Sequence, residues 1–441
     1  MTGAVAERER VLSAFLEAER GRVAGACHDI ARAFNRGAVL YPCARGAATT
    51  DAAHVAVEFM HPVIVGKRAL PAVAPSNDPT GESNLDRLAR PGDIALVLSH
   101  GDHDVSDLVA RAQARGMLTI AMTAGRPGVA DHSFAVPSTD PAIVQEVQET
   151  TYHVLWELVH VFFEHPGLLE ESCVTCGDVA VEADVVGLRG HTAVVQKGGA
   201  REEVAVDLVG EVSVGDRLLC HAGVALERMP AGDAPPADDP SGFLYPFLEA
   251  GEGDLGAVLA DVEASTVRKG ADVMELRRAI DSDAIARCAA AVCERLLAGG
   301  RLIAFGNGGS STDAQDVAAD ALARGWPALA LNNDVATITA VGNDVGFDNV
   351  FARQLIALGA AGDIALAIST SGSSPNVIAG LEQAHRRGML TCALTGYDGG
   401  RLAELAWLDH LFVVRSDYIP RLQEAHATIY HLLLDAIGGR Q

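Results

Sequence analysis

The chain has 441 residues, of which 49% are hydrophobic and 21% charged, so it is too long for one core and we expect about three domains. A formal net charge of −24 makes nucleic acid and anionic membrane surfaces poor partners. Its eight cysteines are scattered, and neither a membrane-length apolar run nor a signal-peptide pattern occurs, so we expect a cytoplasmic protein with reduced thiols.

The first 170 residues alternate short apolar runs with segments of helical periodicity. The runs Ile94–Leu98 and Leu118–Met122 carry almost no polar positions, which is typical of parallel strands that are covered on both faces. This alternation predicts a doubly wound α/β domain whose ligands bind at the carboxyl ends of the strands.

The same pattern returns near the end of the chain. The matching pairs of segments, in the same order, are 37–59 with 300–322, 91–123 with 361–395, and VQEVQETTYHVLWELV with IPRLQEAHATIYHLLL. In the first pair each segment reads as a strand, a loop of small residues and a helix that begins at an aspartate, Asp51 or Asp313. Three matching blocks in one order predict an internal duplication.

Between the two copies the sequence changes character. Residues 171–229 read as short strands separated by glycine turns, which predicts a small β-barrel. The run PAGDAPPADDPSG has the composition of a linker, and helical segments follow at 255–298. We therefore predict an α/β fold in which two doubly wound parallel-sheet domains flank a β-barrel. The predicted parts are domain 1–170, barrel 171–230, linker 231–254 and domain 255–441.

Two loops in the C-terminal copy have the composition of a phosphate site. GNGGSS (residues 306–311) follows one strand and opens a helix, where glycines let the backbone approach a ligand and unpaired N–H groups face an anion. STSGSS (residues 369–374) follows another strand and precedes a helix that begins at Pro375, and its hydroxyls add donors without charge. Either loop alone reads equally well as helix capping, whereas two at the strand ends of one sheet predict phosphate binding.

The C-terminal copy resembles the phosphoheptose isomerase family of SIS (sugar isomerase) domains between about residues 296 and 437. The motifs that carry the resemblance are GNGGSS, VGNDVGFDNVFARQL, AISTSGSSPNVI, LTGYDGG and RLQEAHATIYH. The resemblance implies sedoheptulose 7-phosphate as substrate, aldose–ketose isomerisation through an enediol, a zinc ion, and His431 as general acid. The phosphate and sugar contacts that it implies are Asn307, Gly308, Gly309, Ser310, Asp344, Ser369, Thr370, Ser371, Ser374 and Gln423.

The two copies divide the family's remaining residues between them. Where the family has a histidine and, four residues later, a glutamate base, the C-terminal copy has Asp316 and Asp320. An aspartate is one methylene shorter, and a general base must come within about 2.6–3.2 Å of its proton. The N-terminal copy keeps His54 and Glu58 at these positions, but SHGDHD replaces its serine loop. The catalytic candidates are therefore His431, Glu58 and Asp320, and the metal candidates are His54 and Asp316.

SIS domains of this type pair and form their active sites at the interface. We therefore predict that the copies form an intramolecular pseudo-dimer, and whether the chain associates further stays open. One composite site then combines His54 and Glu58 with the serine loops, Gln423 and His431. The alternative is that His54 and Glu58 are solvated helix residues left from the duplication.

Two other groups of histidines read as structural. We expect His100 and His103 to lie in a polar loop that faces solvent, and not in a metal site. The histidines and aromatic residues of TTYHVLWELVHVFFEH fall at helical spacing, so we expect core and surface positions there and not ligands.

The middle module resembles the HypC/HupF family of hydrogenase maturation chaperones. The shared features are a leading cysteine and the runs REEVAVDLV and VGDRLLCHAGVALERM. The resemblance implies that Cys173 carries an iron precursor and contacts a maturation scaffold or the hydrogenase large subunit, with His221 at the family's other position; a thiolate is a soft ligand that suits such iron. The alternatives are a zinc site of Cys173, Cys176, Cys220 and His221, and an interaction barrel with incidental thiols.

Two classes of function follow. The first is a phosphoheptose-type isomerase with the barrel as a docking or regulatory insert. The second is a non-catalytic hydrogenase assembly chaperone or a sugar-phosphate sensor. His54, Glu58 and His431 favour the first class, whereas Asp316 and Asp320 favour the second.

Overall fold

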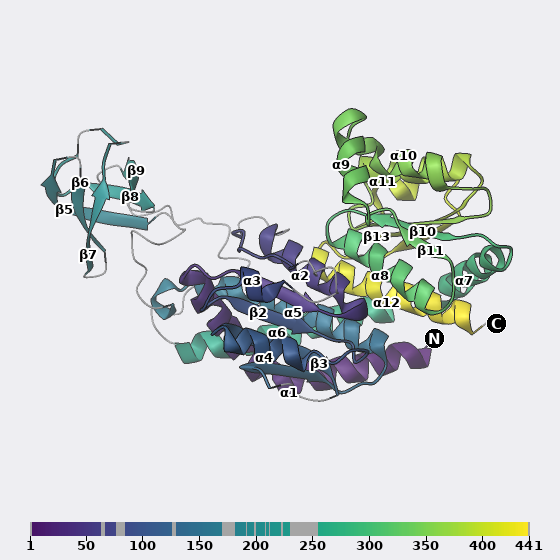
Figure 1. The fold of residues 1–441 in the computed structure, drawn as a ribbon, viewed down its shortest axis with the longest axis horizontal. Coiled ribbons are helices and arrows are strands. Elements are labelled where there is room, and N and C mark those ends of the chain that lie inside the picture. Colours follow the sequence, from purple (N-terminus) through teal and green to yellow (C-terminus); the bar gives the residue numbers. More distant parts are fainter. Residues whose placement is uncertain are drawn as a thin grey trace. The chain divides into compact units, whose positions relative to one another are not determined.

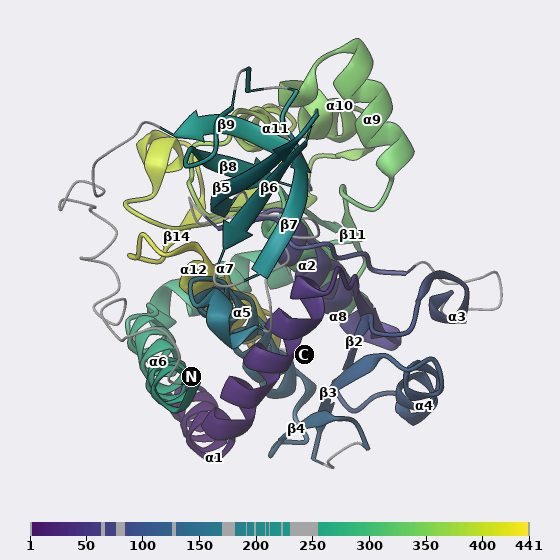
Figure 2. The ribbon, with the colours of Figure 1, turned by 90° about the vertical axis from the view of Figure 1, so that its left-hand side faces the viewer.

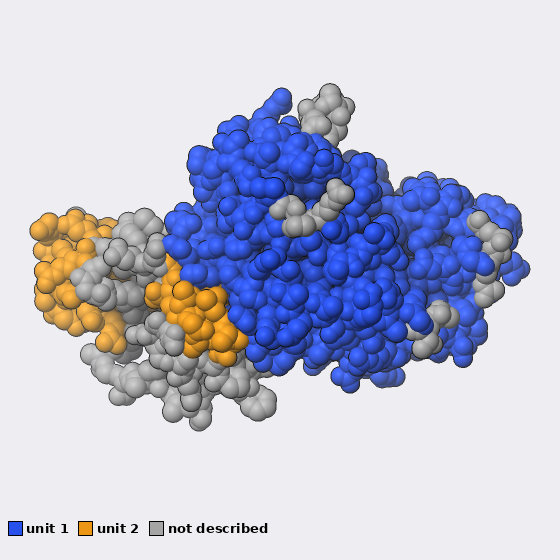
Figure 3. All heavy atoms as spheres, turned by 90° about the horizontal axis from the view of Figure 1, so that it is seen from below, with its two compact units in different colours: residues 1–160, 262–441 blue, residues 161–261 orange. Residues whose placement is uncertain are grey.

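The computed structural model divides the chain into two compact units, which Figure 3 colours blue and orange. One unit combines residues 1–160 with 262–441 and holds both copies of the repeat, and the other spans residues 161–261. The predicted domain boundaries stay predictions, and the expected linker 231–254 lies outside the described residues. The structure describes residues 2–62, 67–75, 84–125, 129–169, 181–190, 192–197, 200–207, 209–210, 212–221, 224–229 and 255–439.

The N-terminal copy is built on a parallel sheet with the strand order β1-β2-β3-β4 (Figures 1 and 2). The five residues of β2 are all buried, as expected of a strand with helices on both faces. The elements are α1 (Thr2–Asn35), β1 (Leu40–Ala44), η1 (Gly46–Ala48), α2 (Thr49–Met60), α3 (Leu85–Leu88), β2 (Ile94–Leu98), α4 (Ser106–Ala114), β3 (Leu118–Ala124), β4 (His132–Val136) and α5 (Pro141–Phe163).

The C-terminal copy has a five-stranded parallel sheet with the order β11-β10-β12-β13-β14. Helices α7, α8 and α12 bury apolar side chains against one face, and α10 and α11 cover the other. The elements are α6 (Leu255–Arg278), α7 (Ser282–Leu297), β10 (Leu302–Gly306), α8 (Gly309–Ala323), β11 (Ala328–Ala330), α9 (Val335–Asp344), η5 (Phe347–Asn349), α10 (Val350–Leu358), β12 (Ile364–Ser369), α11 (Pro375–Arg386), β13 (Leu390–Thr395), η6 (Gly400–Glu404), β14 (His410–Val413) and α12 (Ile419–Gly438).

The two copies pack against each other inside one unit. Helix α2 of the N-terminal copy lies against α8 of the C-terminal copy. Helices α5 and α12 exchange side-chain hydrogen bonds in antiparallel order, from Thr428 to Glu146 at 2.7 Å and from Arg421 to Glu157 at 2.8 Å. Because buried charges must be paired, the acids of α5 also need cations from other helices, and Arg8 of α1 and Arg277 of α6 pair with Glu146.

The middle unit contains a closed β-barrel, as the glycine-punctuated sequence predicted. Its strands follow the order β5-β6-β7-β9-β8 around the barrel, and alternate residues such as Val185 and Val195 fill the interior. The strands are β5 (Val181–Arg189), β6 (Thr192–Lys197), β7 (Ala200–Ala205), β8 (Arg217–His221) and β9 (Val224–Met229).

The predicted fold class is confirmed, and the helix starts need one correction. Helix α11 begins at Pro375 as expected, but α8 begins at Gly309 and α2 at Thr49, and not at Asp313 and Asp51. The positive φ of 57° at Gly308 turns the chain straight into α8, so Asp313 lies inside the helix. Among the helices that the structure describes, none has the length and apolar composition needed to cross a membrane.

Candidate functional site

The two serine and glycine loops meet at the point where the strand order reverses. Strands β10 and β12 are neighbours, with Gly306 opposite Ile368, and their following helices run to opposite faces of the sheet. Ligands of doubly wound folds bind at such a switch point, outside the carboxyl ends of the strands. Residues 307–310 and 370–374 therefore border one ligand position, with the N-terminus of the 15-residue helix α8 directed at it.

The predicted phosphate residues differ in how exposed they are. Ser310 and Ser369 are buried, Thr370 and Ser374 are half-buried, and Ser371 is exposed. The hydroxyls of Ser369 and Ser374 lie 3.3 Å apart, at the two ends of one loop. The loop at residues 369–374 therefore has hydroxyl groups that range from buried to exposed. Such an arrangement suits an anion that approaches from the surface.

Two of the expected sugar contacts have partners within the protein. The amides of Asn307 and Asn376 exchange two hydrogen bonds of 2.9 Å and so tie the first loop to the start of α11. Asp344 is exposed at the end of α9, where it accepts a hydrogen bond of 2.7 Å from Asn343. Asn307 thus braces the two loops, and a sugar contact by either residue stays a prediction.

Side chains of the N-terminal copy reach the first turn of α8. The Nε2 atom of His54 lies 3.1 Å from Nε2 of Gln423 and 3.7 Å from Oε1 of Glu58. A methyl group built on Gly309 would collide with the Gln423 amide and would lie 2.7 Å from the same His54 nitrogen. His54, Glu58 and Gln423 thus come together from two copies beside the phosphate loop, and His54 and Glu58 are buried and not solvated.

The hydrogen bonds around His54 fix its tautomer. Its Nδ1 lies 3.1 Å from the hydroxyl of Tyr152, and that hydroxyl lies 3.3 Å from a carboxylate oxygen of Asp51. The hydroxyl donates to Asp51 and accepts from Nδ1–H of His54, so Nε2 keeps a lone pair. The Gln423 amide then donates to that lone pair.

Carboxylates are unusually dense behind this histidine. Burial and the charges of neighbouring acids raise the pKa values of Glu149, Asp313 and Asp316 well above their usual range. Asp316 accepts a hydrogen bond from Thr50, and Asp51 pairs with His100 at 3.0 Å. These carboxylates would carry more negative charge than the neighbouring donors neutralise. Some of them must therefore be protonated, or a cation must bind among them.

His431 lies in a different place from the one that the composite site required. Its Nδ1 lies 2.9 Å from Glu146 and its Nε2 lies 3.2 Å from the side-chain oxygen of Gln145, with Asp320 at 3.6 Å. Asp320 is about 16 Å along α8 from Gly309, since each residue adds 1.5 Å. The three catalytic candidates therefore separate, with Glu58 next to His54, which borders Gly309, and His431 next to Asp320.

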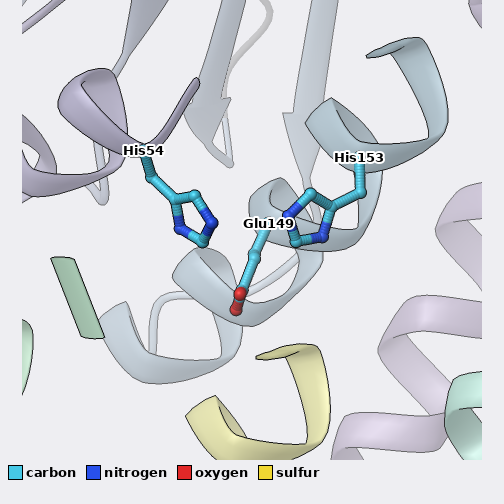
Figure 4. Close-up of side chains that lie close together, drawn as sticks. All are labelled: His54, Glu149 and His153. Atoms are coloured by element: carbon cyan, nitrogen blue, oxygen red, sulfur yellow. The ribbon is translucent and has the colours of Figure 1, made fainter. Parts of the chain in front are cut away.

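The expected metal ligands fit only in part. The described residues contain one group of three side chains with the spacing of metal ligands, formed by His54, Glu149 and His153, and Figure 4 shows them side by side. One ligand atom of each lies within 4.8 Å of the others. His54 belongs to this group and Asp316 does not. Glu149 and His153 stand four residues apart on α5, a spacing that was visible in the sequence but that reads equally as an ordinary buried helix face.

In the N-terminal copy a protein carboxylate lies against the turn that corresponds to the GNGGSS loop. Asp102 accepts from the backbone N–H of Ala47 at 3.4 Å, and Arg45 is held by Asp107 through two bonds of 2.6 and 2.7 Å. The loop does not face solvent throughout, because His100 is 4% exposed. Burial favours its neutral ring, but the hydrogen bond and charge of Asp51 outweigh burial and raise the pKa of His100.

The barrel residues are described only in part. Cys173 and Cys176 lie outside the described residues, and His221 ends β8. Cys220 is buried in the barrel, and burial raises the pKa of its thiol. Neither Cys173 chemistry nor the alternative zinc site is tested by these residues.

The sheet order, the switch-point loops and the paired copies define a protein of the SIS class. The SIS domain family model matches residues 267–396. The fold of the C-terminal domain of glucosamine-fructose-6-phosphate aminotransferase from Francisella tularensis covers 97% of this chain and 95% of its own, with a TM-score of 0.50 and 8% identity. At that identity the likeness shows the fold alone, and the fold extends over both copies.

Sequence relatives narrow the class. The phosphoheptose isomerase of Geobacter sp. strain M21 is 41% identical over 186 residues, which are 41% of this chain and 95% of that protein. The phosphoheptose isomerase of Sulfurimonas denitrificans is 48% identical over 143 residues, 31% of this chain and 72% of its own. The chain therefore belongs to the phosphoheptose isomerase family of SIS-domain proteins. The HupF/HypC family model matches residues 179–236, so the inserted barrel is of the HypC type.

Proposed function

We propose that the chain binds a phosphorylated sugar at the C-terminal serine loops and isomerises it with a base supplied by the N-terminal copy. The substrate is a ketose or aldose phosphate of the sedoheptulose 7-phosphate type. The phosphate group lies against the N-terminus of α8 and the hydroxyls of Ser310, Ser369 and Ser371. Glu58 takes the proton from the hydroxyl-bearing carbon next to the carbonyl, which gives an enediol, and returns it to the former carbonyl carbon. The proton of the hydroxyl group moves to the former carbonyl oxygen, so that the sugar is isomerised with no net gain or loss of protons.

One observation carries this proposal: His54 and Gln423, which belong to different copies, lie 3.1 Å apart beside Gly309. Glu58 is adjacent to that contact, and its Oε2 is a buried atom without a hydrogen-bond partner among the described residues. A carboxylate oxygen that is not consumed by the fold is available for proton transfer. Neither copy alone holds both the serine loops and the His–Glu pair.

We expect Ser371→Asp to abolish binding of sedoheptulose 7-phosphate without harming the fold. Ser371 is exposed, so the new carboxylate disturbs little packing but places a negative charge where the phosphate must lie. A loss of at least tenfold in affinity, about 1.4 kcal/mol, is expected in isothermal titration calorimetry. Ser106→Asp is the matched control, because Ser106 is exposed at the start of the helix after the corresponding N-terminal loop. Equal affinities in the two variants would contradict the proposed phosphate site.

A second candidate function is sugar-phosphate sensing without turnover, and the position of His431 favours it. Both ring nitrogens of His431 are engaged, by Glu146 and by Gln145, so this residue is held as part of the packing between α5 and α12. An isomerase without that acid must use another proton donor. Calorimetric binding of sedoheptulose 7-phosphate with no conversion by purified protein, with or without Zn²⁺, would select the sensor.

We also propose that the barrel links this sugar-phosphate unit to hydrogenase maturation. The support is the family match of residues 179–236 and the leading Cys173 of the sequence. The partner is a maturation scaffold protein or the hydrogenase large subunit, and Cys173 carries or transfers an iron precursor as a soft thiolate ligand.

Cys173→Ala is expected to abolish complex formation with a purified hydrogenase maturation scaffold protein, because a carried iron precursor needs the thiolate. Size-exclusion chromatography of the two purified proteins measures the complex. Cys220→Ala is the matched control, since its thiol is buried within the barrel and its pKa is raised. A complex that survives Cys173→Ala unchanged would leave the barrel as an interaction module with incidental thiols.

A further inference from the structure

We propose that the N-terminal copy binds an aliphatic polyamine in a cleft at the carboxyl ends of β2 and β3. The cleft has a volume of about 890 Å³, and its walls come from residues 99–107, from α4 and from the end of β3. Figures 1 and 2 show α4 beside β3. Ligand sites commonly have volumes of about 300–1,000 Å³, and open α/β sheets bind ligands outside the carboxyl ends of their strands.

The cleft lies where the N-terminal copy has a shorter connection than the C-terminal copy. In each copy the strand is followed by an aspartate that accepts two hydrogen bonds from a threonine of that strand, Asp131 after β3 and Asp409 after β13. These pairs mark equivalent ends of the connection, which is formed by residues 124–130 in one copy and 396–408 in the other. The connection of the N-terminal copy is therefore six residues shorter.

In the C-terminal copy the additional residues pack against the serine loop. They include the short helix η6, whose Leu402 is fully buried and donates its backbone N–H to the carbonyl oxygen of Gly372 at 3.0 Å. Asp102 stands at the position of Gly372 in the N-terminal loop, and it lines the cleft. The C-terminal copy thus fills this place with an apolar side chain, whereas the N-terminal copy has a cleft with acidic side chains.

The described residues that line the cleft include three aspartates and no lysine or arginine. Arg45 pairs with one of them, Asp107, through bonds of 2.6 and 2.7 Å. Asp104 accepts the backbone N–H of Ser106 at 2.9 Å, and Asp102 accepts one backbone N–H at 3.4 Å. Hydrogen bonds from Ser106 and Arg45 lower the pKa values of Asp104 and Asp107, so both are charged at neutral pH. A carboxylate can accept about four hydrogen bonds, so Asp102 and Asp104 can still bind a cation.

Much of the remaining wall is apolar, which selects an organic cation. Val105, Val109, Ala121 and Ala124 are among the lining residues. A hydrated metal ion would use the carboxylates but not this wall. An aliphatic polyamine uses both, since its ammonium groups donate to carboxylates and its methylene chains remove apolar surface from water. A sugar phosphate is disfavoured here, because its charge has the same sign as that of the aspartates.

Titration calorimetry of the full-length protein with spermidine tests the proposal. One molecule is expected to bind per chain at physiological salt, and octanediol, a neutral chain of similar length, should not bind. The pH is set above the titration range of histidine, because a protonated His103, 3.6 Å from Asp102, would compete. Asp104→Asn should weaken binding about threefold or more, and addition of Asp102→Asn at least about tenfold in total. Each asparagine keeps an oxygen that accepts the backbone N–H, so both variants should fold.

Asp140→Asn is the matched control and should bind spermidine as the parent does. Asp140 is exposed in the same copy and accepts the backbone N–H of Ala142 at 3.0 Å in the same way, but it does not line the cleft. A second pair of variants tests the cleft itself. Ala110→Trp should fill it and weaken binding at least about tenfold, whereas Ala114→Trp, exposed on the same helix outside the cleft, should not.

Equal affinities in Asp104→Asn and Asp140→Asn would show that spermidine responds only to the overall negative charge, and would overturn the proposal. Retained binding in Ala110→Trp would overturn it as well, and so would displacement of spermidine by an equal concentration of Mg²⁺, which would make the aspartates a metal site. The result does not depend on the proposed isomerase site. Spermidine binding without affinity for sedoheptulose 7-phosphate would refute the proposed function and keep the polyamine site, and the opposite pair of results would do the reverse.

Discussion

Glu58→Gln is expected to lower the turnover of sedoheptulose 7-phosphate by about 10²–10⁴-fold while leaving its affinity nearly unchanged. The glutamine keeps the shape of the side chain but cannot accept the proton that isomerisation moves. Glu58 lies 3.7 Å from His54, which in turn borders Gly309 at the start of α8. In the proposed site we therefore expect the carboxylate to lie beside the sugar and not beneath the phosphate. Steady-state kinetics and calorimetry on the same preparation separate the two effects.

Asp320→Asn is the matched control, since Asp320 occupies the corresponding position in the other copy. It lies near His431 and Arg324, about three helical turns from Gly309. We expect its turnover to stay close to that of the parent. Full turnover by Glu58→Gln would remove the composite site, and a strong loss in Asp320→Asn would move the base to the C-terminal copy.

The second large effect concerns stability. Glu146→Gln is expected to lower the free energy of unfolding by about 3–5 kcal/mol, because it leaves buried cations without their counter-charge. Glu146 lies 2.8 Å from Arg8, 3.2 Å from Arg277 and 2.9 Å from His431, and it accepts a hydrogen bond of 2.7 Å from Thr428. Chemical unfolding monitored by circular dichroism measures the loss.

The same carboxylate predicts a pH dependence. Burial alone would raise the pKa of Glu146, but the charges of Arg277 and Arg8 outweigh burial and lower it well below its usual range. A lowered folded-state pKa stabilises the protein above the unfolded value of about 4.3, and this contribution is lost as the pH falls through the folded-state pKa. The free energy of unfolding of the parent should therefore fall in acid. The Glu146→Gln variant lacks this contribution at every pH, so the difference between the two proteins should shrink as the pH falls.

Glu382→Gln is the control for both measurements. The side chain of Glu382 is 42% exposed and pairs with Arg386 at 3.4 Å one helical turn away, a contact worth about 0.5 kcal/mol or less. If Glu146→Gln also lowered the free energy of unfolding by only about 0.5 kcal/mol, the charges around Glu146 would be better solvated than their contacts indicate.

The duplication explains why neither copy looks complete. In the C-terminal copy the serine loops are intact, and in the N-terminal copy Asp102 occupies the corresponding helix N-terminus as an internal anion. The pair His54 and Glu58 stands opposite the intact loop because α2 packs against α8 in one unit. In the proposed composite site, the C-terminal copy holds the anion and the N-terminal copy supplies the groups beside it.

The sequence by itself determined the repeat, the doubly wound sheets, the barrel and the position of the two serine and glycine loops. Each of these follows from local pattern: apolar runs such as Ile364–Ser369 are strands because every residue must be buried, and glycine at 308 is required by a positive φ. The local pattern also singled out His54 and Glu58. Alignment of the two copies places them at the positions that Asp316 and Asp320 occupy in the C-terminal copy.

Only the tertiary structure decided which side chains meet. Gln423 and His431 stand eight residues apart on α12, about 12 Å along its axis, so one helix delivers them to different neighbours, His54 and Glu146. His153 is a buried core position, as its helical spacing predicted, but only the structure shows that its ring lies against His54 of α2, with the ring centroids 5.2 Å apart. Contacts between copies depend on how helices distant in sequence cross, and a spacing within one helix carries no information about that crossing.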